Sequence, residues 1–395
     1  MTRTLNASGA AISTSARSLA PDLARGFMLL AIALAHAPAL AGDWSMGPAA
    51  LNTAVGFLKS LLADNQARAM FVFLFGYGLG QLAFRQQARG EEWISIRKLL
   101  RRRGFWLLVI GFLNAAVLVP IDIIAVYGLT LLMAAPLVRA RDAVLDWTAG
   151  LTLVPATLLL AWQSVRANAL AAAGTPETLA SYMEPDFLTH LVAGLPSWPI
   201  ETLVASLIVL PGMLMGIWAA RRRILDEPER HVGLLRRVTW VFLLLAVAGR
   251  LPAALLVTGV WATESVPVQW AVAVAHDLTG YLGGVGMAAA VGLAAVAIGE
   301  RRGPFTTALV ALGQRSMTFY IFQSVVWLAL FYPFTLGLHD AMGAAATWAV
   351  AAGVWAVSLL LAEWMRRAGW RGPGEVLLRK LSYKKASHAS SAHAS

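Results

Sequence analysis

Two ionisable side chains share one face of the first long apolar stretch of this sequence. Arg25 and His36 lie eleven residues apart, which is almost three helical turns and roughly 16 Å along a helix axis. Asp22 precedes Arg25 by three residues and therefore neighbours it on that face. An ionisable group in hydrocarbon costs roughly 2.5 kcal/mol or more, so each such group needs a partner or a purpose. A site that exchanges protons through His36 is one interpretation, and satisfied packing residues are the other.

Other polar groups lie toward the outer ends of their apolar stretches, as His36 does. We predict that Arg68, Asp122, His276 and Asp277 lie at a depth similar to that of His36 and form a polar chamber with it, open to the outside. Further polar residues at or near this depth are Asn114, Tyr127, Tyr320 and Gln323.

Structural interpretations of these residues stand beside the functional one. Arg68 and Asp122 could pair with each other without doing chemistry. Asp277 points about 100° away from its neighbour His276 around a helix, so it is not expected to orient that ring simply. Arg250 is expected to reach the outer interface with its guanidinium. A lone intramembrane histidine is often a hydrogen-bonded packing residue.

The composition explains why these side chains must be embedded. Of the 395 residues, 58% are hydrophobic and 13% are charged, whereas soluble domains carry about 25% charged residues. The net charge of +11 comes from short basic runs between apolar segments, which are typical of topology signals and lipid contacts, and nucleic acid is therefore not an expected partner. The absence of cysteine excludes disulfides, thiolate metal sites and cysteine nucleophiles, and no motif for a metal or organic cofactor is present.

Apolar stretches of about 20 residues predict membrane-spanning helices. Ten stretches are expected to cross: 22–42, 66–84, 104–119, 121–138, 145–164, 199–220, 238–258, 268–298, 316–333 and 342–365. With the N-terminus inside, 28 of the 32 basic residues lie on the cytoplasmic side. The sequence thus predicts an all-α, polytopic integral membrane bundle of about ten transmembrane helices, multi-pass in the bacterial inner membrane, with both termini cytoplasmic.

The domain organisation is expected to be simple. Residues 1–18 are predicted to form a disordered cytoplasmic tail, 19–385 a single transmembrane helical domain, and 386–395 a disordered C-terminal tail. The stretch 49–62 is apolar but too short to cross, so it is expected to be interfacial or half-inserted. The glycine-rich stretches 75–80 and 280–286 are interpreted as helix-packing faces.

Five segments together resemble the YeiB-like family of bacterial polytopic membrane proteins, a domain of unknown function. In chain order they are Asp22–Gly26, Phe73–Gly78, Asp122–Ile124 with Tyr127–Leu129, Gly313–Tyr320 with Gln323–Ser324, and Gly372–Glu375 with Arg379. They run in the family's order over nearly the whole chain. Two positions depart from the family pattern: Asn114 stands where many relatives carry histidine, and His36 where many carry asparagine.

The first stretch also resembles the wider group of transmembrane acyltransferases, whose first helix carries arginine, ten residues and then histidine. The resemblance implies transfer of an acyl group from cytoplasmic acyl-CoA to an envelope glycan, lipid or other extracytoplasmic acceptor, with His36 as general base. Asp122 or Asp277 would be the electrostatic partner of His36, and Arg25 with 101–103 would bind the donor. The candidate catalytic residues are then His36, Asp122, His276 and Asp277. The candidate substrate-binding residues are Arg25, Arg68, Asn114, Tyr127, Tyr320 and Gln323.

Two other functions fit the same residues. A transporter or permease of a small molecule or lipid would use them as a proton relay or substrate site, but the sequence shows no internal repeat and no helix broken by glycine or proline. A structural membrane protein would use them only for packing. Membrane lipids are the expected surroundings in all three cases.

Overall fold

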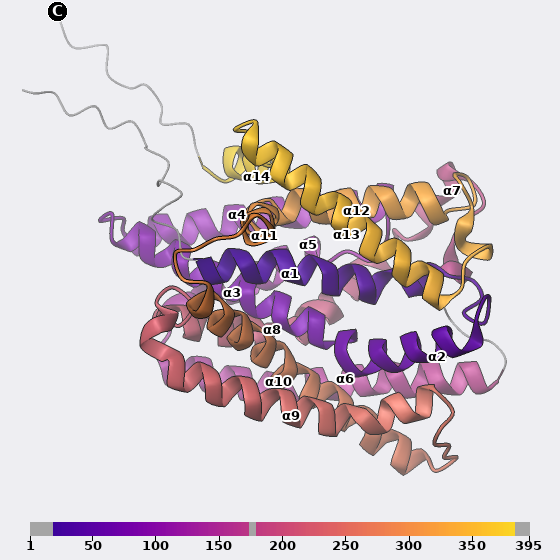
Figure 1. Cartoon of the computed structure of the whole chain (residues 1–395). Coiled ribbons are helices and arrows are strands. Elements are labelled where there is room, and N and C mark those ends of the chain that lie inside the picture. Colours follow the sequence, from indigo (N-terminus) through magenta and orange to yellow (C-terminus); the bar gives the residue numbers. More distant parts are fainter. Residues whose placement is uncertain (1–18, 174–178, 384–395) are drawn as a thin grey trace, which may run out of the picture.

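The computed structural model describes residues 19–173 and 179–383, and within these ranges every regular element is a helix (Figure 1). The predicted tails, 1–18 and 386–395, lie outside the described residues. The longer helices are α1 (Leu19–His36), α2 (Ala49–Leu58), α3 (Gln66–Gln87), α4 (Trp93–Val117), α5 (Ile124–Ala134), α6 (Asp142–Ala172), α7 (Phe187–Ala193), α8 (Trp198–Arg221), α9 (Val232–Val257), α10 (Val266–Ile298), α11 (Pro304–Gly313), α12 (Ser316–Phe331), α13 (Ala344–Arg367) and α14 (Pro373–Ser382). Short 3₁₀ or π turns are η2 (Ala37–Leu40), η3 (Lys59–Ala63), η4 (Ala135–Arg139), η5 (Ala180–Tyr182), η6 (Pro228–His231) and η7 (Leu338–Asp340).

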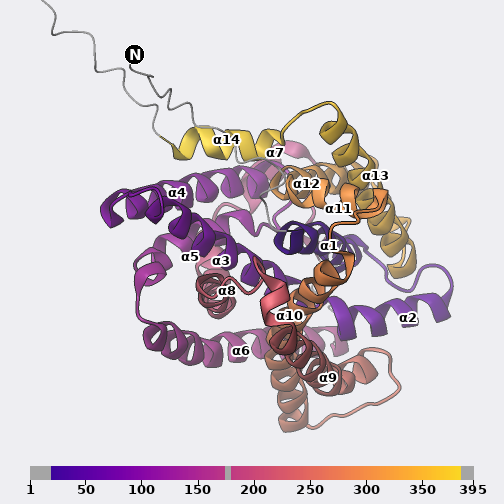
Figure 2. The same cartoon turned by 60° about the vertical axis from the view of Figure 1, so that its left-hand side comes forward.

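Seven helical segments are long and apolar enough to cross a membrane. They are Leu19–Leu40, Ala49–Gln87, Asp142–Ala172, Trp198–Arg221, Pro228–Val257, Val266–Ile298 and Ala344–Arg367. Helices α6 and α9 lie at the edge of the bundle (Figure 2), and they expose large apolar side chains such as Trp147, Leu151, Trp240 and Leu244. An outer surface of this kind requires hydrocarbon rather than water as its solvent. The fold is therefore that of an integral membrane bundle.

The predicted stretches coincide with helices, but the number of crossings stays a prediction. Shorter apolar helices cover Ile124–Arg139, Pro304–Gly313 and Ser316–Phe331. The stretch Pro304–Gly313 was not predicted, because ten apolar residues are too few to signal a crossing. In the structure this helix, α11, packs against α1 and α13. Helix α1 begins and α14 ends toward the same end of the bundle (Figure 1), as an even number of crossings would require.

Helix α1 lies in the middle of the bundle, where α3, α10, α11 and α13 contact it (Figure 2). Its close contact with α11 depends on glycine: a Cβ at Gly26 would collide with the carbonyl oxygen of Leu309, and one at Gly313 with that of Asp22. Small residues allow helices in a bilayer to approach this closely. The side chains carried by α1 are therefore placed at the centre of the molecule.

The predicted glycine packing faces are confirmed. A Cβ at Gly76 of α3 would collide with the carbonyl oxygen of Met213 on α8, and one at Gly216 of α8 would collide with that of Phe73. On α10, a Cβ at Gly284 would lie 2.5 Å from the backbone nitrogen of Met70. These contacts hold α3 between α8 and α10.

The segment between α2 and α3 is broken, although it contains neither glycine nor proline. Residues 59–63 form a π turn, Asp64 is extended with ψ 139°, and Asn65 has a positive φ of 49°. Asparagine tolerates a positive φ better than most residues do, so Asn65 can occupy a position where glycine would be expected. This break was not predicted from the sequence, because the expectation concerned helices broken by glycine or proline and residues 59–65 contain neither.

Candidate functional site

Arg25 lies in the first half of α1, and His36 ends the helix. Arg25 donates to Asp22 over 3.1 Å, and its guanidinium lies against Gly78 of α3. His36 is the last residue of α1 and is half-buried. It lies within electrostatic range of Lys59 and Arg68. No hydrogen-bond partner of the His36 ring is found within residues 19–173 and 179–383.

A second polar group gathers at the turn between α4 and α5. Asp122 accepts from the backbone N–H of Ala125 over 2.6 Å and from Asn114 over 3.2 Å. Tyr320 of α12 donates to the carbonyl of Ile121 over 2.8 Å and accepts from the N–H of Ile123 over 3.2 Å. Asp122 thus holds the first turn of α5, and Tyr320 fixes the turn to α12. Both contacts are structural in kind, and neither residue touches His36 in a recorded hydrogen bond.

Several polar atoms of the predicted substrate-binding residues are buried without a partner among the described residues. They are Asn114 Oδ1, the Tyr127 hydroxyl and Gln323 Oε1. The ring of Tyr127 stacks on Phe75 with centroids 4.4 Å apart, and Gln323 donates to the carbonyl of Leu29 over 3.2 Å. Unpaired buried polar atoms are costly and mark places where a bound water or ligand would be stabilised.

The break at 59–65 is held by a third group, which centres on Arg250. The guanidinium of Arg250 donates to the carbonyls of Ser60 and Leu61, the latter over 2.8 Å, and its side chain is 0% exposed. The expectation that Arg250 reaches the outer interface was wrong. Its depth gave a usable signal, because Arg250 lies eight residues inside the predicted outer end of its stretch, or about 12 Å. The broken turn leaves backbone carbonyls without helical partners, and Arg250 donates hydrogen bonds to them.

His276 and Asp277 interact, contrary to the argument from helix geometry. The His276 Nδ1 lies 3.1 Å from Asp277 Oδ1, and His276 Nε2 lies 3.1 Å from the carbonyl oxygen of Ser60. The directions of Cβ atoms on a helix do not settle where the ends of longer side chains meet. Both ring nitrogens of His276 are engaged, which favours a structural role in holding the broken turn.

Arg68 lies between these groups. Its Nε and Nη2 donate to Asn65 Oδ1 over 3.3 and 3.0 Å, and Asn65 donates to the carbonyl of Asp277 over 3.0 Å. Arg68 is also within electrostatic range of Tyr127. The suggested pairing of Arg68 with Asp122 is not present, since each side chain has other partners. The structure thus brings Arg68, His276 and Asp277 together and sets Asp122 in a neighbouring group.

The basic end of the bundle carries the predicted donor arginines. Among residues 101–103, Arg101 is exposed, while Arg103 is half-buried and its Nε has no hydrogen-bond partner within the described part of the chain. Arg103 lies within electrostatic range of Arg25, of Tyr383 and of Glu375. Two guanidinium groups, from α1 and α4, therefore lie within electrostatic range of each other at this end.

Comparison with known proteins agrees with the resemblance noted in the sequence. Residues 219–385 match the model of a family described as "Protein of unknown function (DUF418)". The chain is 25% identical over 339 residues to the "Uncharacterized protein YxaH" of Bacillus subtilis (strain 168), a match that covers 80% of this chain and 78% of that protein. The family match is consistent with a YeiB-like protein. It includes Arg250, His276 and Tyr320, whereas Arg25 and His36 precede it.

Proposed function

We propose that this protein is a membrane-embedded acyltransferase that moves an acyl group from cytoplasmic acyl-CoA to a hydroxyl or amine acceptor in the bacterial envelope. The proposal includes ten crossings of the inner membrane with both termini in the cytoplasm. The observation that carries it is the difference between the two intramembrane histidines. The ring of His276 is held on both sides, whereas that of His36 has no hydrogen bond within residues 19–173 and 179–383 and lies within electrostatic range of Lys59 and Arg68.

The proposed reaction uses His36 as general base. Its imidazole takes the proton from the acceptor O–H or N–H, and the acceptor oxygen or nitrogen bonds to the thioester carbon. The oxyanion that develops on the carbonyl is stabilised by the positive charge of Arg68, whereas the charge of Lys59 is paired with Asp64 over 2.6 Å. When the C–S bond breaks, the thiolate of coenzyme A takes the proton from the imidazolium. The products are the acylated acceptor and free coenzyme A.

Donor binding is assigned to the opposite end of α1. Arg25 and Arg103 lie within electrostatic range of each other there, and the acidic partner Asp22 is hydrogen-bonded to Arg25 and to Gln314. Paired guanidinium groups bind phosphate oxygens well. A donor whose phosphates lie at Arg25 would have to extend roughly 16 Å along α1 for its thioester to reach His36.

Ligand binding to purified protein in detergent tests the proposal first. Acetyl-CoA and longer acyl-CoA are expected to raise the unfolding temperature of the wild type in a saturable way, because a ligand that binds the folded state stabilises it. Arg25→Ala and Arg25→Lys should lose this ligand-dependent rise, and the exposed Arg85→Ala on α3 should keep it. Absence of any rise with all donors, or an equal loss in Arg85→Ala, would refute the donor assignment.

The broken segment 59–65 favours the alternative of a transporter, since interrupted helices line substrate sites in many transporters. In this chain, however, Arg250 and His276 already occupy the carbonyls of Ser60 and Leu61. Release of free coenzyme A by protein in detergent, where there are no compartments, distinguishes the two functions. Transport alone cannot produce it.

A further inference from the structure

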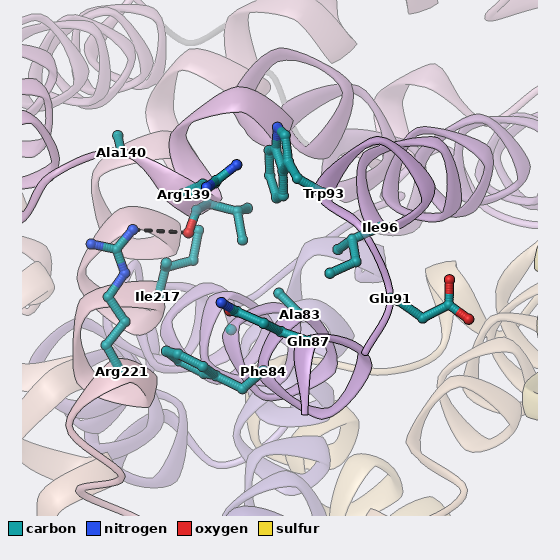
Figure 3. Close-up of a pocket in the computed structure, with 12 residues that line it drawn as sticks. Ala83, Phe84, Gln87, Glu91, Trp93, Ile96, Arg139, Ala140, Ile217 and Arg221 are labelled. Atoms are coloured by element: carbon teal, nitrogen blue, oxygen red, sulfur yellow. Dashed lines mark hydrogen bonds between the residues drawn. The ribbon is translucent and has the colours of Figure 1, made fainter. Parts of the chain in front are cut away.

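A pocket of about 320 Å³ lies beside Arg139 and Arg221 (Figure 3). Its walls come from the end of α3, the start of α4, the turn η4 and the end of α8. The lining is apolar at Phe84, Ile96 and Ile217, while Trp93 and Arg139 stand on the opposite side from Phe84 (Figure 3). The pocket therefore combines an apolar wall with a basic rim.

The two arginines of this rim differ in their partners. Arg221 donates to Asp142 over 2.6 Å and to the carbonyl of Val138 over 2.8 Å, so its charge is neutralised and its position fixed. Arg139 is exposed, and its guanidinium lies 5.9 Å from the centroid of the Trp93 ring. Within the described residues no acidic group pairs with Arg139. Its charge and its N–H donors are available to a ligand.

The acidic residue that lines the pocket, Glu91, does not neutralise Arg139. The carboxylate of Glu91 points away from both arginines (Figure 3), and Gln87 presents an uncharged amide to the space between them. The pocket is thus complementary to a single negative charge attached to an apolar body.

The pocket is separate from the proposed donor site. On α3, Gly78 faces the guanidinium of Arg25, whereas Gly80 faces Ala220 of α8 and lines the pocket. Two residues correspond to about 200° around a helix, so these positions lie on opposite faces of α3. A ligand in the pocket would contact α3, α4 and α8 without approaching α1.

We propose that this pocket binds the headgroup phosphate of an anionic phospholipid in the cytoplasmic leaflet, with Arg139 as its main ionic contact. The positive-inside rule places the basic end of a bundle in that leaflet. Basic pockets between transmembrane helices on this side bind anionic headgroups, and tryptophan sits at the headgroup level. The acyl chains would leave the pocket along Phe84 toward the surrounding lipid. A lipid held there joins the ends of α3, α4 and α8.

The test titrates lipids into delipidated protein in a neutral detergent and follows thermal unfolding. Phosphatidylglycerol is expected to raise the midpoint saturably, and phosphatidylcholine is not. Arg139→Gln should need about fivefold more phosphatidylglycerol for half of the effect, since one basic residue at a membrane surface contributes about that much to anionic-lipid binding. The matched control is Arg141→Gln, an exposed arginine two residues away, which should titrate as the wild type does.

Three outcomes would overturn the proposal. Equal responses to the two lipids would show that no anionic headgroup is recognised. An equal loss in Arg141→Gln would assign the effect to diffuse surface charge. Arg139-dependent stabilisation by inorganic phosphate or acyl-CoA, without one by phosphatidylglycerol, would assign the pocket to a soluble phosphate. The acyltransferase proposal is judged separately, by coenzyme A release and by Arg25.

Discussion

At the scale of single residues, the two intramembrane histidines are the sharpest contrast in the molecule. We predict that His36→Gln lowers coenzyme A release at least 100-fold, because a positioned general base contributes about that much, while the unfolding temperature stays close to that of the wild type. His276→Gln should instead lower the unfolding temperature, because it disturbs the contacts with Asp277 and Ser60. Thiol release from acyl-CoA and thermal unfolding measure the two effects. If His276→Gln abolished coenzyme A release and His36→Gln lowered only the unfolding temperature, His276 and not His36 would be the general base.

Arg250 is predicted to stabilise the broken segment. Arg250→Met leaves the buried carbonyl of Leu61 without its donor and leaves that of Ser60 with His276 alone, so we expect a loss of about 3 kcal/mol in the free energy of unfolding. Arg236→Met, an exposed arginine on the same helix, is the control and should change stability little. Chemical unfolding in mixed micelles measures both. A loss of equal size in the control, or none in Arg250→Met, would contradict the clamp described here.

The sequence predicts a common depth for the residues of the candidate site, but it does not predict which of them pair. Hydropathy places Arg68, Asp122 and His276 at a similar level, because the cost of burying a charge limits where such residues occur. It does not say which helices touch. The partners of Arg250 are two backbone carbonyls that an irregular turn leaves unpaired. Every residue type has a backbone carbonyl, so the sequence does not indicate which carbonyls are unpaired. For the same reason the contact of His276 with Ser60 was not foreseen.

At the scale of elements, the packing of α3 on α8 depends on the absence of side chains. We predict that Gly216→Ala destabilises the protein by about 1–3 kcal/mol, because the added Cβ collides with the backbone of Phe73. Gly353→Ala on α13 is the matched control: nothing lies within 4 Å of its Cβ position, and alanine favours helix over glycine. Thermal unfolding of the two variants compares them. Equal unfolding temperatures of the two variants would show that α3 and α8 can move apart at little cost in stability.

Helix α7 should dock in a pH-dependent way. Burial lowers the pKa of His190 below its ordinary value of 6.5, and the backbone of Leu118 and the charge of Glu184 oppose the shift only in part. The neutral ring packs edge-on against Tyr332 with centroids 4.9 Å apart. The undocked ring binds a proton near its ordinary pKa, so docking is fully stable above about pH 7 and weakens as the pH falls below 6.5 toward the lower pKa of the docked state.

Hydrogen exchange over residues 187–193 measures this docking. Protection, corrected for intrinsic exchange rates, should fall between pH 7.5 and pH 5.5 in the wild type. His190→Leu should keep the same protection at both values, because its side chain cannot be protonated. Unchanged protection in the wild type, or a pH dependence that persists in His190→Leu, would show that another group controls α7.

At the scale of the whole molecule, hydropathy alone predicts the helical bundle well. Each of the ten stretches chosen by length and apolarity coincides with a helix, because the bilayer requires long apolar helices with internally satisfied backbones. Prediction from hydropathy fails for segments that are not long, regular, apolar helices. Helix α11 is too short to be recognised by length and is identified only by its contact with α1, and the break at 59–65 survives because Arg250 and His276 satisfy its carbonyls.

The orientation of the bundle in the membrane decides whether the proposed donor site faces the compartment that contains acyl-CoA. The chain is well suited to an experiment that measures this orientation. Because it has no cysteine, a single introduced thiol reports its own side of the membrane. Glu229 and Ala262 are exposed residues that precede and follow α9, outside its two ends. In right-side-out vesicles, Ala262→Cys should react with a membrane-impermeant maleimide and Glu229→Cys should not, and inside-out vesicles should reverse this. The opposite result would place Arg25 and Arg103 outside the cytoplasm, where acyl-CoA is absent, and would refute both the proposed donor and the cytoplasmic lipid site.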